Sequence, residues 1–259
     1  MMDTTSPTLL LDHHLKRLKL PTMLREYSTI SAICARENLD HLEFLHRLVE
    51  RELIEREQRA AQRRIKTARF PVMKTLDTFQ FDVQPSINRS LVLELARGEY
   101  LERQESVLFM GNPGTGKTHL ATALGHAACM QGKRVRFFSV TGLVTQLLEA
   151  REDRQLERLM KRLEKQHLII LDEMGYVPFS KAGAELLYEV VSRAYERTSL
   201  ILTTNLPFEN WTEVFGNQRL TGALIDRITH RVHIIEANGE SYRLRDARRR
   251  AKRKKGKLK

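Results

Sequence analysis

Residues 106–118 read SVLFMGNPGTGKT, an apolar run followed at once by a glycine-rich turn. The turn, 111–118, fits the pattern G-x-x-x-x-G-K-[ST], and the residues after it, HLATALGHAACM, have the composition of a helix. In such a strand–turn–helix unit, backbone N–H groups turn inward around phosphates and the helix N-terminus adds positive potential. The stretch therefore predicts an ATP site at the end of a buried strand.

Each residue of this turn has an expected part in the site. Lys117 is expected to reach the β and γ phosphates and to act in hydrolysis, and Thr118 to ligate Mg²⁺ through its hydroxyl. A chance glycine-rich turn is the alternative, and the strand and helix on either side argue against it. The predicted ATP-binding residues are Gly111, Asn112, Pro113, Gly114, Thr115, Gly116, Lys117, Thr118 and His119.

A second motif, HLIILDE at 167–173, ends an apolar run with two adjacent carboxylates. Asp172 is placed at the strand's carboxyl end to hold Mg²⁺, directly or through water, and Glu173 to polarise the attacking water. Adjacent carboxylates at a buried strand tip are unfavourable without a cation. The alternative is an ordinary strand followed by an acidic turn, against which the upstream phosphate-binding loop argues.

Short apolar strands alternate with helical segments from residue 91 onward. Continuous apolar strands separated by helices are typical of a parallel sheet covered on both faces, so the sequence predicts an α/β fold with five parallel strands. The expected strands are 106–110, 135–140, 167–171, 200–203 and 232–235.

The N-terminal part has helical periodicity instead. One or two short helices are expected around Pro21, and a longer helix from near Asp40, where Asp40-x-x-Glu43 fits a capping box. The apolar positions of this helix, at three-to-four spacing, are Leu42, Leu45, Leu48, Val49 and Leu53. The expected organisation is a helical N-terminal domain at 1–66, a connector at 67–90, an ATPase domain at 91–244 and a basic tail at 245–259.

Positive charge is unevenly distributed along the chain. Of the net charge of +12, +9 lies in 245–259, where ten Lys and Arg accompany one Asp. Such a block attracts polyanions, and nucleic-acid contact is weighed against a solubilising role. Basic residues also recur at helical spacing before residue 67 and in a charged helical stretch at 147–166. The DNA-binding candidates are Arg56, Arg59, Arg63, Lys66, Arg151, Arg154 and Arg158, with a solvated helix face as the alternative for each.

Other classes of protein are disfavoured by what the sequence lacks. No apolar run approaches the ~18 residues that cross a bilayer, and the N-terminus lacks the order of a signal peptide, so a cytoplasmic protein without membrane contact is expected. Cys34 and Cys129 have neither a CxxC spacing nor partnering histidines, which disfavours a disulfide framework or a zinc site.

Several features resemble the AAA+ ATPases of the additional-strand type. A glutamate follows the magnesium aspartate, and a further strand separates the two motifs. Asn205, after the strand SLILTT, resembles the sensor-one residue that orients water near the γ-phosphate, with a turn-forming Asn as the alternative. The segment ALIDRITHR resembles the region that offers an arginine finger to the neighbouring subunit's nucleotide. Arg227 is the preferred catalytic arginine, Arg219 and Arg231 remain open, and an intrachain salt bridge is the alternative.

Nearly the whole chain resembles the IstB-like transposition ATPases, which are encoded beside a transposase in bacterial insertion sequences and are related to the helicase loader DnaC. The segments that carry the likeness are LPTMLREY, FQFDVQPSINRSLVLELA, GNPGTGKTHLATALG, LDEMGYVPFS, TTNLPFENW and GESYRL. In one respect the chain departs from the broader AAA+ pattern, because about two dozen residues follow the last strand. A full helical C-terminal lid is therefore not expected, and Arg243 is the candidate for the sensor-two arginine.

The resemblance implies an ATP hydrolase that uses ATP and Mg²⁺. It implies a homo-oligomer, ring or helical, that assembles on duplex DNA and selects or remodels the target to recruit and activate a transposase. A helicase loader, acting on single-stranded DNA and a hexameric helicase, is the alternative reading of the same core.

Overall fold

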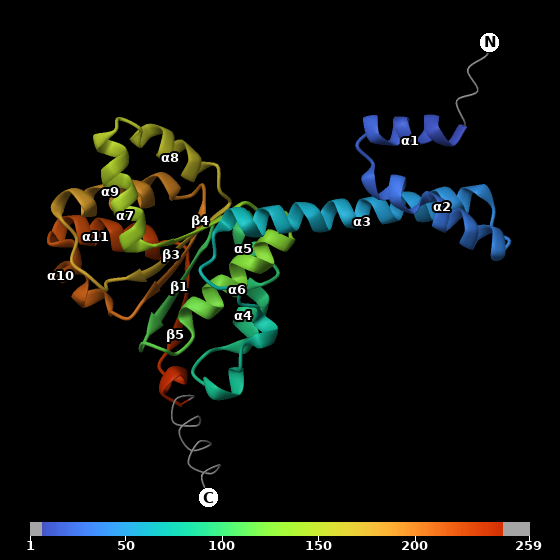
Figure 1. The fold of residues 1–259 in the computed structure, drawn as a ribbon. Coiled ribbons are helices and arrows are strands. Elements are labelled where there is room, and N and C mark those ends of the chain that lie inside the picture. The colour runs from blue at the N-terminus through green and yellow to red at the C-terminus, as the bar shows by residue number, and fades with distance from the viewer. Residues whose placement is uncertain (1–6, 246–259) are drawn as a thin grey trace, which may run out of the picture. The chain divides into compact units, whose positions relative to one another are not determined.

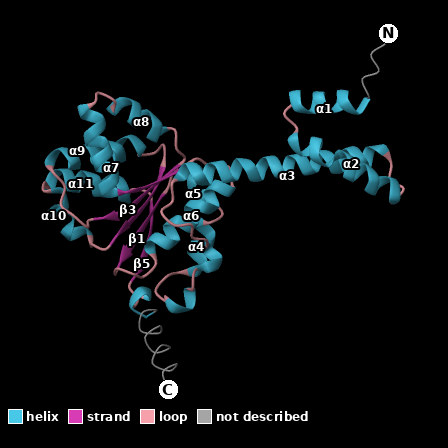
Figure 2. Cartoon of the chain, in the orientation of Figure 1, coloured by secondary structure: helices cyan, strands magenta, loops and turns pink. Residues whose placement is uncertain are grey.

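The structure is a computed structural model, in which residues 7–245 are described. It is built around a five-stranded parallel sheet (Figure 2). The strand order is β2-β3-β4-β1-β5. The predicted α/β fold and its strands are confirmed, each strand ending within three residues of the expected position. The strands are β1 (Ser106–Gly111), β2 (Val135–Ser139), β3 (Leu168–Met174), β4 (Ser199–Thr204) and β5 (Val232–Ala237).

Helices cover both faces of the sheet (Figure 1). One face carries α4 (Arg89–Leu95), α5 (Glu99–Glu102) and α6 (Lys117–Met130). The opposite face carries α7 (Val140–Glu152), α8 (Leu156–Glu164), α9 (Lys181–Ala194), α10 (Trp211–Phe215) and α11 (Gln218–Thr229). Short 3-10 turns lie at η1 (Leu76–Thr78), η2 (Phe81–Val83) and η3 (Phe208–Asn210).

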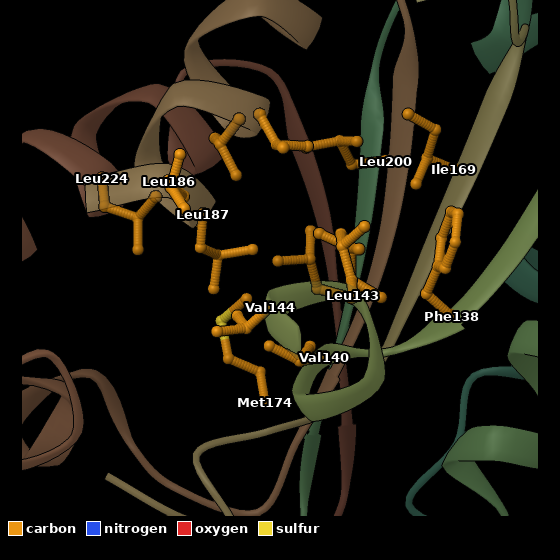
Figure 3. Close-up of a cluster of buried hydrophobic side chains, with 14 of the residues drawn as sticks. Phe138, Val140, Leu143, Val144, Ile169, Met174, Leu186, Leu187, Leu200 and Leu224 are labelled. Atoms are coloured by element: carbon orange, nitrogen blue, oxygen red, sulfur yellow. The ribbon is translucent and has the colours of Figure 1, made fainter. Parts of the chain in front are cut away.

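The core follows from the alternation of side chains along each strand. In β1, Val107 and Phe109 are buried against α6, whereas Leu108 is buried on the other face with Leu143 of α7 and Leu187 of α9 (Figure 3). Burial of one such side chain stabilises the fold by roughly 1.5–3 kcal/mol. Both faces of the sheet are therefore sealed, and polar residues concentrate at the strand ends.

The sheet order places the predicted motifs next to one another. The strand inserted between the phosphate-loop strand β1 and the acidic strand β3 is β4, with Leu202 paired to both Leu108 and Leu171. This inserted strand is the defining feature of the additional-strand ATPases. Because all strands are parallel, the ends of β1, β3 and β4 meet at one edge of the sheet.

The N-terminal helices are α1 (Pro7–Arg17), α2 (Pro21–Arg36) and α3 (His41–Ala68). The chain divides into two compact units between Arg63 and Arg64, inside α3. Half of the expected capping box forms: Asp40 Oδ1 accepts a hydrogen bond from the Glu43 backbone N–H at 2.8 Å, whereas the Glu43 carboxylate accepts from Arg47 at 2.9 Å.

The apolar positions expected on one face of α3 are mostly solvent-exposed. Leu42 is 75% exposed and Leu53 54% exposed, and Leu48 is the member of that set that enters the core of the N-terminal unit. The core-facing positions of α3 are Phe44, Leu48 and Glu52, spaced by four residues, because α1 and α2 pack along that side of the helix. The helix expected from near Asp40 is thus present, but of its five expected apolar positions Leu48 is the one that is buried.

The charged stretch at 147–166 is helical, as expected, and is divided between two helices. α7 ends at Glu152, Arg154 adopts a left-handed φ of 56°, and α8 begins at Leu156. Arg193 of α9 then pairs with Glu157 and Glu164 on α8. No helix within residues 7–245 is both long and apolar enough to cross a membrane.

Candidate nucleotide-binding site

The loop between β1 and α6 is held in a conformation that only glycine tolerates at key points. Gly111 has a φ of 136°, and a Cβ there would lie 2.4 Å from the Ala237 carbonyl oxygen of the neighbouring strand. Gly116 has a φ of 98°, and a Cβ there would lie 2.6 Å from the Phe79 ring. The loop therefore packs closely between β5 and the connector, and the Asn112 N–H donates to the Ala237 carbonyl oxygen at 3.2 Å.

Lys117, the first residue of α6, folds back along the loop. Its Nζ donates to the carbonyl oxygens of Gly111 at 2.6 Å and Asn112 at 2.7 Å. Burial lowers the pKa of Lys117 to about 8; Asp172 opposes this shift and Arg243 adds to it. A partly desolvated ammonium group gains strongly from an incoming phosphate, so Lys117 is positioned to bind one.

Asp172 lies at the tip of β3 and is 5% exposed. Its Oδ1 accepts hydrogen bonds from Thr118 Oγ1 at 2.8 Å and Thr203 Oγ1 at 2.6 Å. Burial raises the pKa of this carboxyl, although both hydroxyls and Lys117 act in the opposite direction. The carboxylate is thus buried with too little positive charge around it, which is the environment that a bound cation relieves.

The oxygens of Thr118 and Asp172 fit magnesium. Mg²⁺ is commonly held by one or two carboxylates, waters and substrate phosphates, and does not need a full protein cage. Within residues 7–245 no three His, Cys, Asp or Glu side chains gather into such a cage. These two side chains would therefore hold Mg²⁺ together with phosphate oxygens.

Glu173 is turned out of the strand by its backbone. It has a φ of 64° within an irregular part of the pairing between β3 and β4, and its N–H donates to Thr203 Oγ1 at 2.9 Å. A non-glycine residue in the left-handed region costs of order 1–3 kcal/mol and is found often at functional sites. The result is an exposed carboxylate beside a buried one, and both line the same cavity.

A cavity of about 640 Å³ lies over this edge of the sheet. That volume is in the range of small-molecule sites, which are roughly 300–1,000 Å³. Asn205, directly after β4, lines it, and its Oδ1 is buried with no hydrogen-bond partner within the described residues. The structure therefore brings Lys117, Thr118, Asp172, Glu173 and Asn205 to one cavity, as the sequence predicted for the strand ends.

The connector forms a wall of this cavity that the motifs did not indicate. His119 Nε2 lies 2.9 Å from the Thr75 carbonyl oxygen and 3.2 Å from Thr78 Oγ1, and its ring packs edge-on against Phe79 at 5.1 Å. Burial lowers the pKa of His119. His119 therefore joins α6 to the connector, a contact that its position after the phosphate loop did not reveal.

The chain after β5 forms another wall. The Tyr242 N–H donates to the Gly114 carbonyl oxygen at 2.9 Å, and Arg243 lines the cavity. Residues 238–245 thus return to the phosphate loop, with 242–245 helical, while 246–259, most of the basic tail, lie outside the described residues. Arg243, the candidate for sensor two, is placed at the cavity.

The three candidate finger arginines lie away from this cavity. Arg227 on α11 donates to the Ala223 carbonyl oxygen at 3.1 Å, and its guanidinium lies 4.8 Å from the centre of the Tyr188 ring. Arg219 and Arg231 are exposed, and none of the three lines the cavity of the chain that carries it. Arg227 has no ion pair within residues 7–245, so the salt-bridge alternative is not seen.

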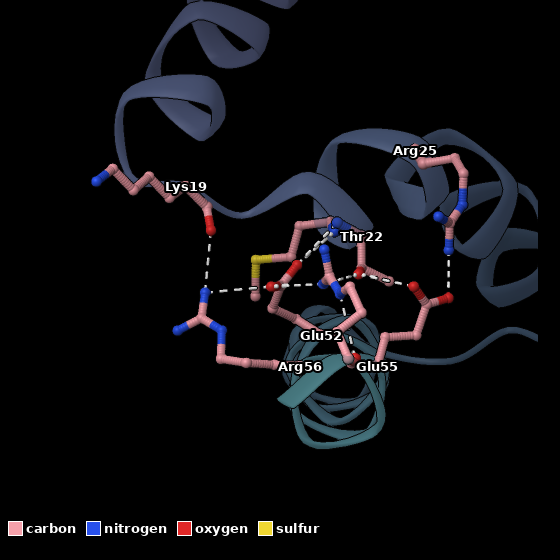
Figure 4. Close-up of polar contacts among 8 residues, drawn as sticks. Lys19, Thr22, Arg25, Glu52, Glu55 and Arg56 are labelled. Atoms are coloured by element: carbon pink, nitrogen blue, oxygen red, sulfur yellow. Dashed lines mark hydrogen bonds and ion pairs between the residues drawn. The ribbon is translucent and has the colours of Figure 1, made fainter. Parts of the chain in front are cut away.

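Two basic residues of the N-terminal helix are engaged in its own fold (Figure 4). Arg56 donates to Glu52 and to the Lys19 carbonyl oxygen, and Arg59 donates to Glu52 and Thr22. Arg63 also has an interaction within the chain. Lys66, which belongs to the same unit as the nucleotide cavity, does not line it.

The basic side chains around the turn from α7 to α8, unlike those of Arg56 and Arg59, are not engaged in polar contacts within the described chain. Arg151, Arg154 and Arg158 are exposed, and none of their side chains has a hydrogen bond or ion pair to another residue within 7–245. Their guanidinium groups are thus available to a ligand such as a phosphate backbone.

Thr203 lines the site but was not among the residues predicted from the sequence. It bridges the two acidic residues, accepting from the Glu173 N–H and donating to Asp172. A signal was present: β4 ends in two threonines after an apolar run, and polar side chains at the carboxyl end of a central strand commonly serve the site. The connector residues gave no comparable signal, because they carry no recognisable motif.

The phosphate loop, the paired acidic residues of β3 and the strand inserted between β1 and β3 together define a P-loop ATPase of the AAA+ type. Comparison with family models matches residues 13–251 to the IstB-like ATP binding proteins. The chain belongs to this family, and ATP is its nucleotide.

Relatives and solved structures agree with this assignment. The chain is 39% identical over 232 residues to the ATP-binding protein of insertion sequence IS5376 from Geobacillus stearothermophilus, covering 90% of this chain and 92% of that protein. It is 40% identical over 234 residues to the ATP-binding protein of IS21 from Pseudomonas aeruginosa, covering 90% and 88%. The crystal structure of the DnaC helicase loader superposes with a TM-score of 0.55 at 22% identity, over 63% of this chain and 96% of that one, a likeness of fold.

Proposed function

We propose that this ATPase assembles on duplex DNA in the presence of ATP and Mg²⁺, in the cytoplasm, and hands the bound site to a partner transposase. The observation that carries the proposal is the cavity shared by Lys117, Asp172 and Glu173, which are groups suited to binding phosphates and Mg²⁺ and to polarising water. The relatives named for insertion sequences support transposition as the process served.

Hydrolysis is assigned to residues at the three strand ends. Lys117 binds the β and γ phosphates, and Asn205 orients the attacking water through its free Oδ1. Glu173 accepts a proton from that water as the water oxygen bonds to the γ-phosphorus and the bond from the γ-phosphorus to the β–γ bridging oxygen breaks, so that this oxygen leaves on ADP. Thr118 and Asp172 hold Mg²⁺, which supplies charge stabilisation when bound. ADP and phosphate are the products.

Assembly is proposed to complete the site. Arg227 is half-buried on α11, lies outside its own chain's cavity and is pre-oriented by Tyr188. An arginine given to a neighbouring subunit's nucleotide stabilises charge in the transition state, so hydrolysis would depend on oligomerisation. Arg243, in the chain's own cavity, would contact the phosphates in the manner of a sensor-two arginine.

DNA contact is assigned first to the turn between α7 and α8. The side chains of Arg151, Arg154 and Arg158 are exposed and have no hydrogen-bond or ion-pair partner among the described residues, whereas Arg56 and Arg59 already pair with Glu52. Phosphate contacts from such side chains position a protein on duplex DNA without reading its sequence. The N-terminal candidates and the basic tail are proposed as supporting contacts.

The proposal is tested by fluorescence anisotropy of labelled duplex and single-stranded DNA, titrated with wild-type and Lys117→Ala protein, with and without ATP and Mg²⁺. Duplex binding that requires both ATP and Lys117 is expected. Stronger ATP-dependent binding to single strands, with co-purification of a hexameric helicase, would replace the proposal by the helicase-loader function. Binding that ignores ATP and Lys117 would contradict both.

A further inference from the structure

The connector and the segment after β5 meet at a buried glutamine. Gln84 follows η2, is 2% exposed, and its Nε2 donates to the Glu240 carbonyl oxygen at 2.8 Å across 156 positions of sequence. Nearby, Ser86 Oγ accepts from the Asn238 N–H at 3.2 Å. These contacts attach residues 238–240 to the connector.

The Gln84 amide packs closely against the backbone of Gly239. A Cβ on Gly239 would lie 1.8 Å from Gln84 Oε1 and 2.8 Å from its Cδ. Gly239 is not in the left-handed region, so its backbone does not demand glycine. A side chain at Gly239 would therefore have to displace the Gln84 amide.

The attached segment reaches the nucleotide cavity within three residues. The Tyr242 N–H is bound to the Gly114 carbonyl oxygen, and a Cβ on Gly114 would lie 2.2 Å from Ser241 Oγ. Arg243 lines the cavity with Lys117. Two hydrogen bonds thus hold the segment that carries Arg243: the one from Gln84 of the connector to Glu240, and the one from Tyr242 to Gly114 of the phosphate loop.

We propose that Gln84 is a positioning residue: it fixes residues 239–243 so that Arg243 faces the phosphates of bound ATP. An arginine on a loosely held segment would sample many orientations, and ordering it on ATP binding would cost conformational entropy and so weaken the affinity for ATP. The Gln84 bond removes this cost before ATP arrives. The inference rests on the proposed contact of Arg243 with the phosphates.

The first test needs no nucleotide. Gln84→Glu keeps the volume of the side chain but places an acceptor against the Glu240 carbonyl oxygen, and Gly239→Ala displaces the amide. Both variants are expected to raise hydrogen exchange at the Tyr242 amide by about tenfold in the full chain. Gln131→Ala is the matched control, because Gln131 Nε2 donates to the Ala96 carbonyl oxygen at the same 2.8 Å distance, away from the cavity. Unchanged exchange in both variants overturns the proposal.

The second test is a double-mutant cycle on ATP turnover with Arg243→Ala. Gln84→Glu and Arg243→Ala are each expected to lower kcat/KM by about tenfold, as for one charge-assisted hydrogen bond, and their combination by no more than Arg243→Ala alone. Effects that multiply would mean that Gln84 does not act through Arg243. A wild-type protein without turnover would refute the ATPase function itself, while the exchange measurement would still decide whether Gln84 fixes the segment.

Discussion

Two buried carboxylates, one in each unit of the chain, show how differently this protein uses the same group. Glu52 in the N-terminal unit is 3% exposed and Asp172 in the ATPase unit is 5% exposed. Burial alone would raise the pKa of Glu52, but hydrogen bonds from the Met23 and Thr22 N–H groups and from Arg56 outweigh it, so the pKa lies below its usual value. The pKa of Asp172 is raised, since burial outweighs its two hydroxyl partners.

Under the proposed function, this difference separates a structural carboxylate, Glu52, from a functional one, Asp172. Glu52 is compensated by two backbone N–H groups and two guanidinium groups, so it contributes to the fold of its unit. Asp172 is compensated incompletely and faces a cavity, so its remaining charge is left for a cation and its phosphates. Changes at the two positions should therefore have opposite consequences for stability and activity.

The largest expected effect is that of Asp172→Asn on ATP turnover. Removing the carboxylate removes a magnesium ligand, and kcat should fall by roughly 100-fold or more. The melting temperature should not fall, because an incompletely compensated buried charge has been removed. Steady-state turnover and thermal unfolding measured on the same preparation check this; a destabilised but active variant would contradict the comparison.

Glu52→Gln should have the reverse profile. Thr22, Met23 and the two arginines lose their anion, and the N-terminal unit should be destabilised by about 2 kcal/mol, a modest figure because Arg56 and Arg59 are half-exposed. Hydrogen exchange in α2 and α3 reports this loss. ATP turnover by the ATPase unit should remain within about twofold, and a large loss would show that Glu52 serves the nucleotide site.

Lowering the pH should destabilise the N-terminal unit through protonation of Glu52. The pKa of Glu52 is lowered in the folded chain, so its stabilising contribution is fully present above the unfolded value of about 4.3 and is lost as pH falls through the folded pKa. Exchange protection in α2 and α3 should therefore fall below about pH 4.3 in the wild type. The Glu52→Gln variant should lose this part of the pH dependence, and identical profiles would contradict the role assigned to Glu52.

Thr203→Val sharpens the comparison on the ATPase side. The substitution conserves shape but removes the donor to Asp172 and the acceptor for the Glu173 N–H. We expect about a tenfold fall in kcat, since each lost hydrogen bond to a charged or buried group is worth roughly 1–3 kcal/mol. Thr204→Val, whose hydroxyl contacts Leu206 instead, is the neighbouring control. Equal falls in kcat for Thr203→Val and Thr204→Val would contradict the role assigned to Thr203 in holding Asp172 and Glu173.

The smallest effects are expected from single arginines in DNA binding. Arg158→Ala should weaken duplex binding a few-fold and reduce the slope of log K against log salt by about one, as for one phosphate contact. Arg56→Ala should change this slope less, because Arg56 is bonded to Glu52 and Lys19. Anisotropy titrations at several salt concentrations measure both, and a larger slope change for Arg56→Ala would reverse the assignment of the DNA surface.

The sequence predicted what short-range patterns encode. The phosphate loop, the Asp172–Glu173 pair and the strands carry their own spacing and hydrophobicity, and parallel strand ends then bring them together. The direction in which α3 buries its residues was not predictable, because it depends on where α1 and α2 pack. Nor were the partners of Thr203 and Gln84, which depend on contacts 30 or more positions away in sequence.

The central claim, that ATP hydrolysis at Glu173 governs an assembly on DNA, is tested most directly by release from duplex DNA. Glu173→Gln protein, bound to labelled duplex in ATP and Mg²⁺, is diluted into unlabelled competitor, and the loss of anisotropy is followed beside wild type. The account predicts that Glu173→Gln binds duplex as well as wild type and dissociates at least about tenfold more slowly, because turnover is blocked while ATP binding remains. Release at the wild-type rate would contradict it, and would leave ATP as a ligand that controls assembly without hydrolysis.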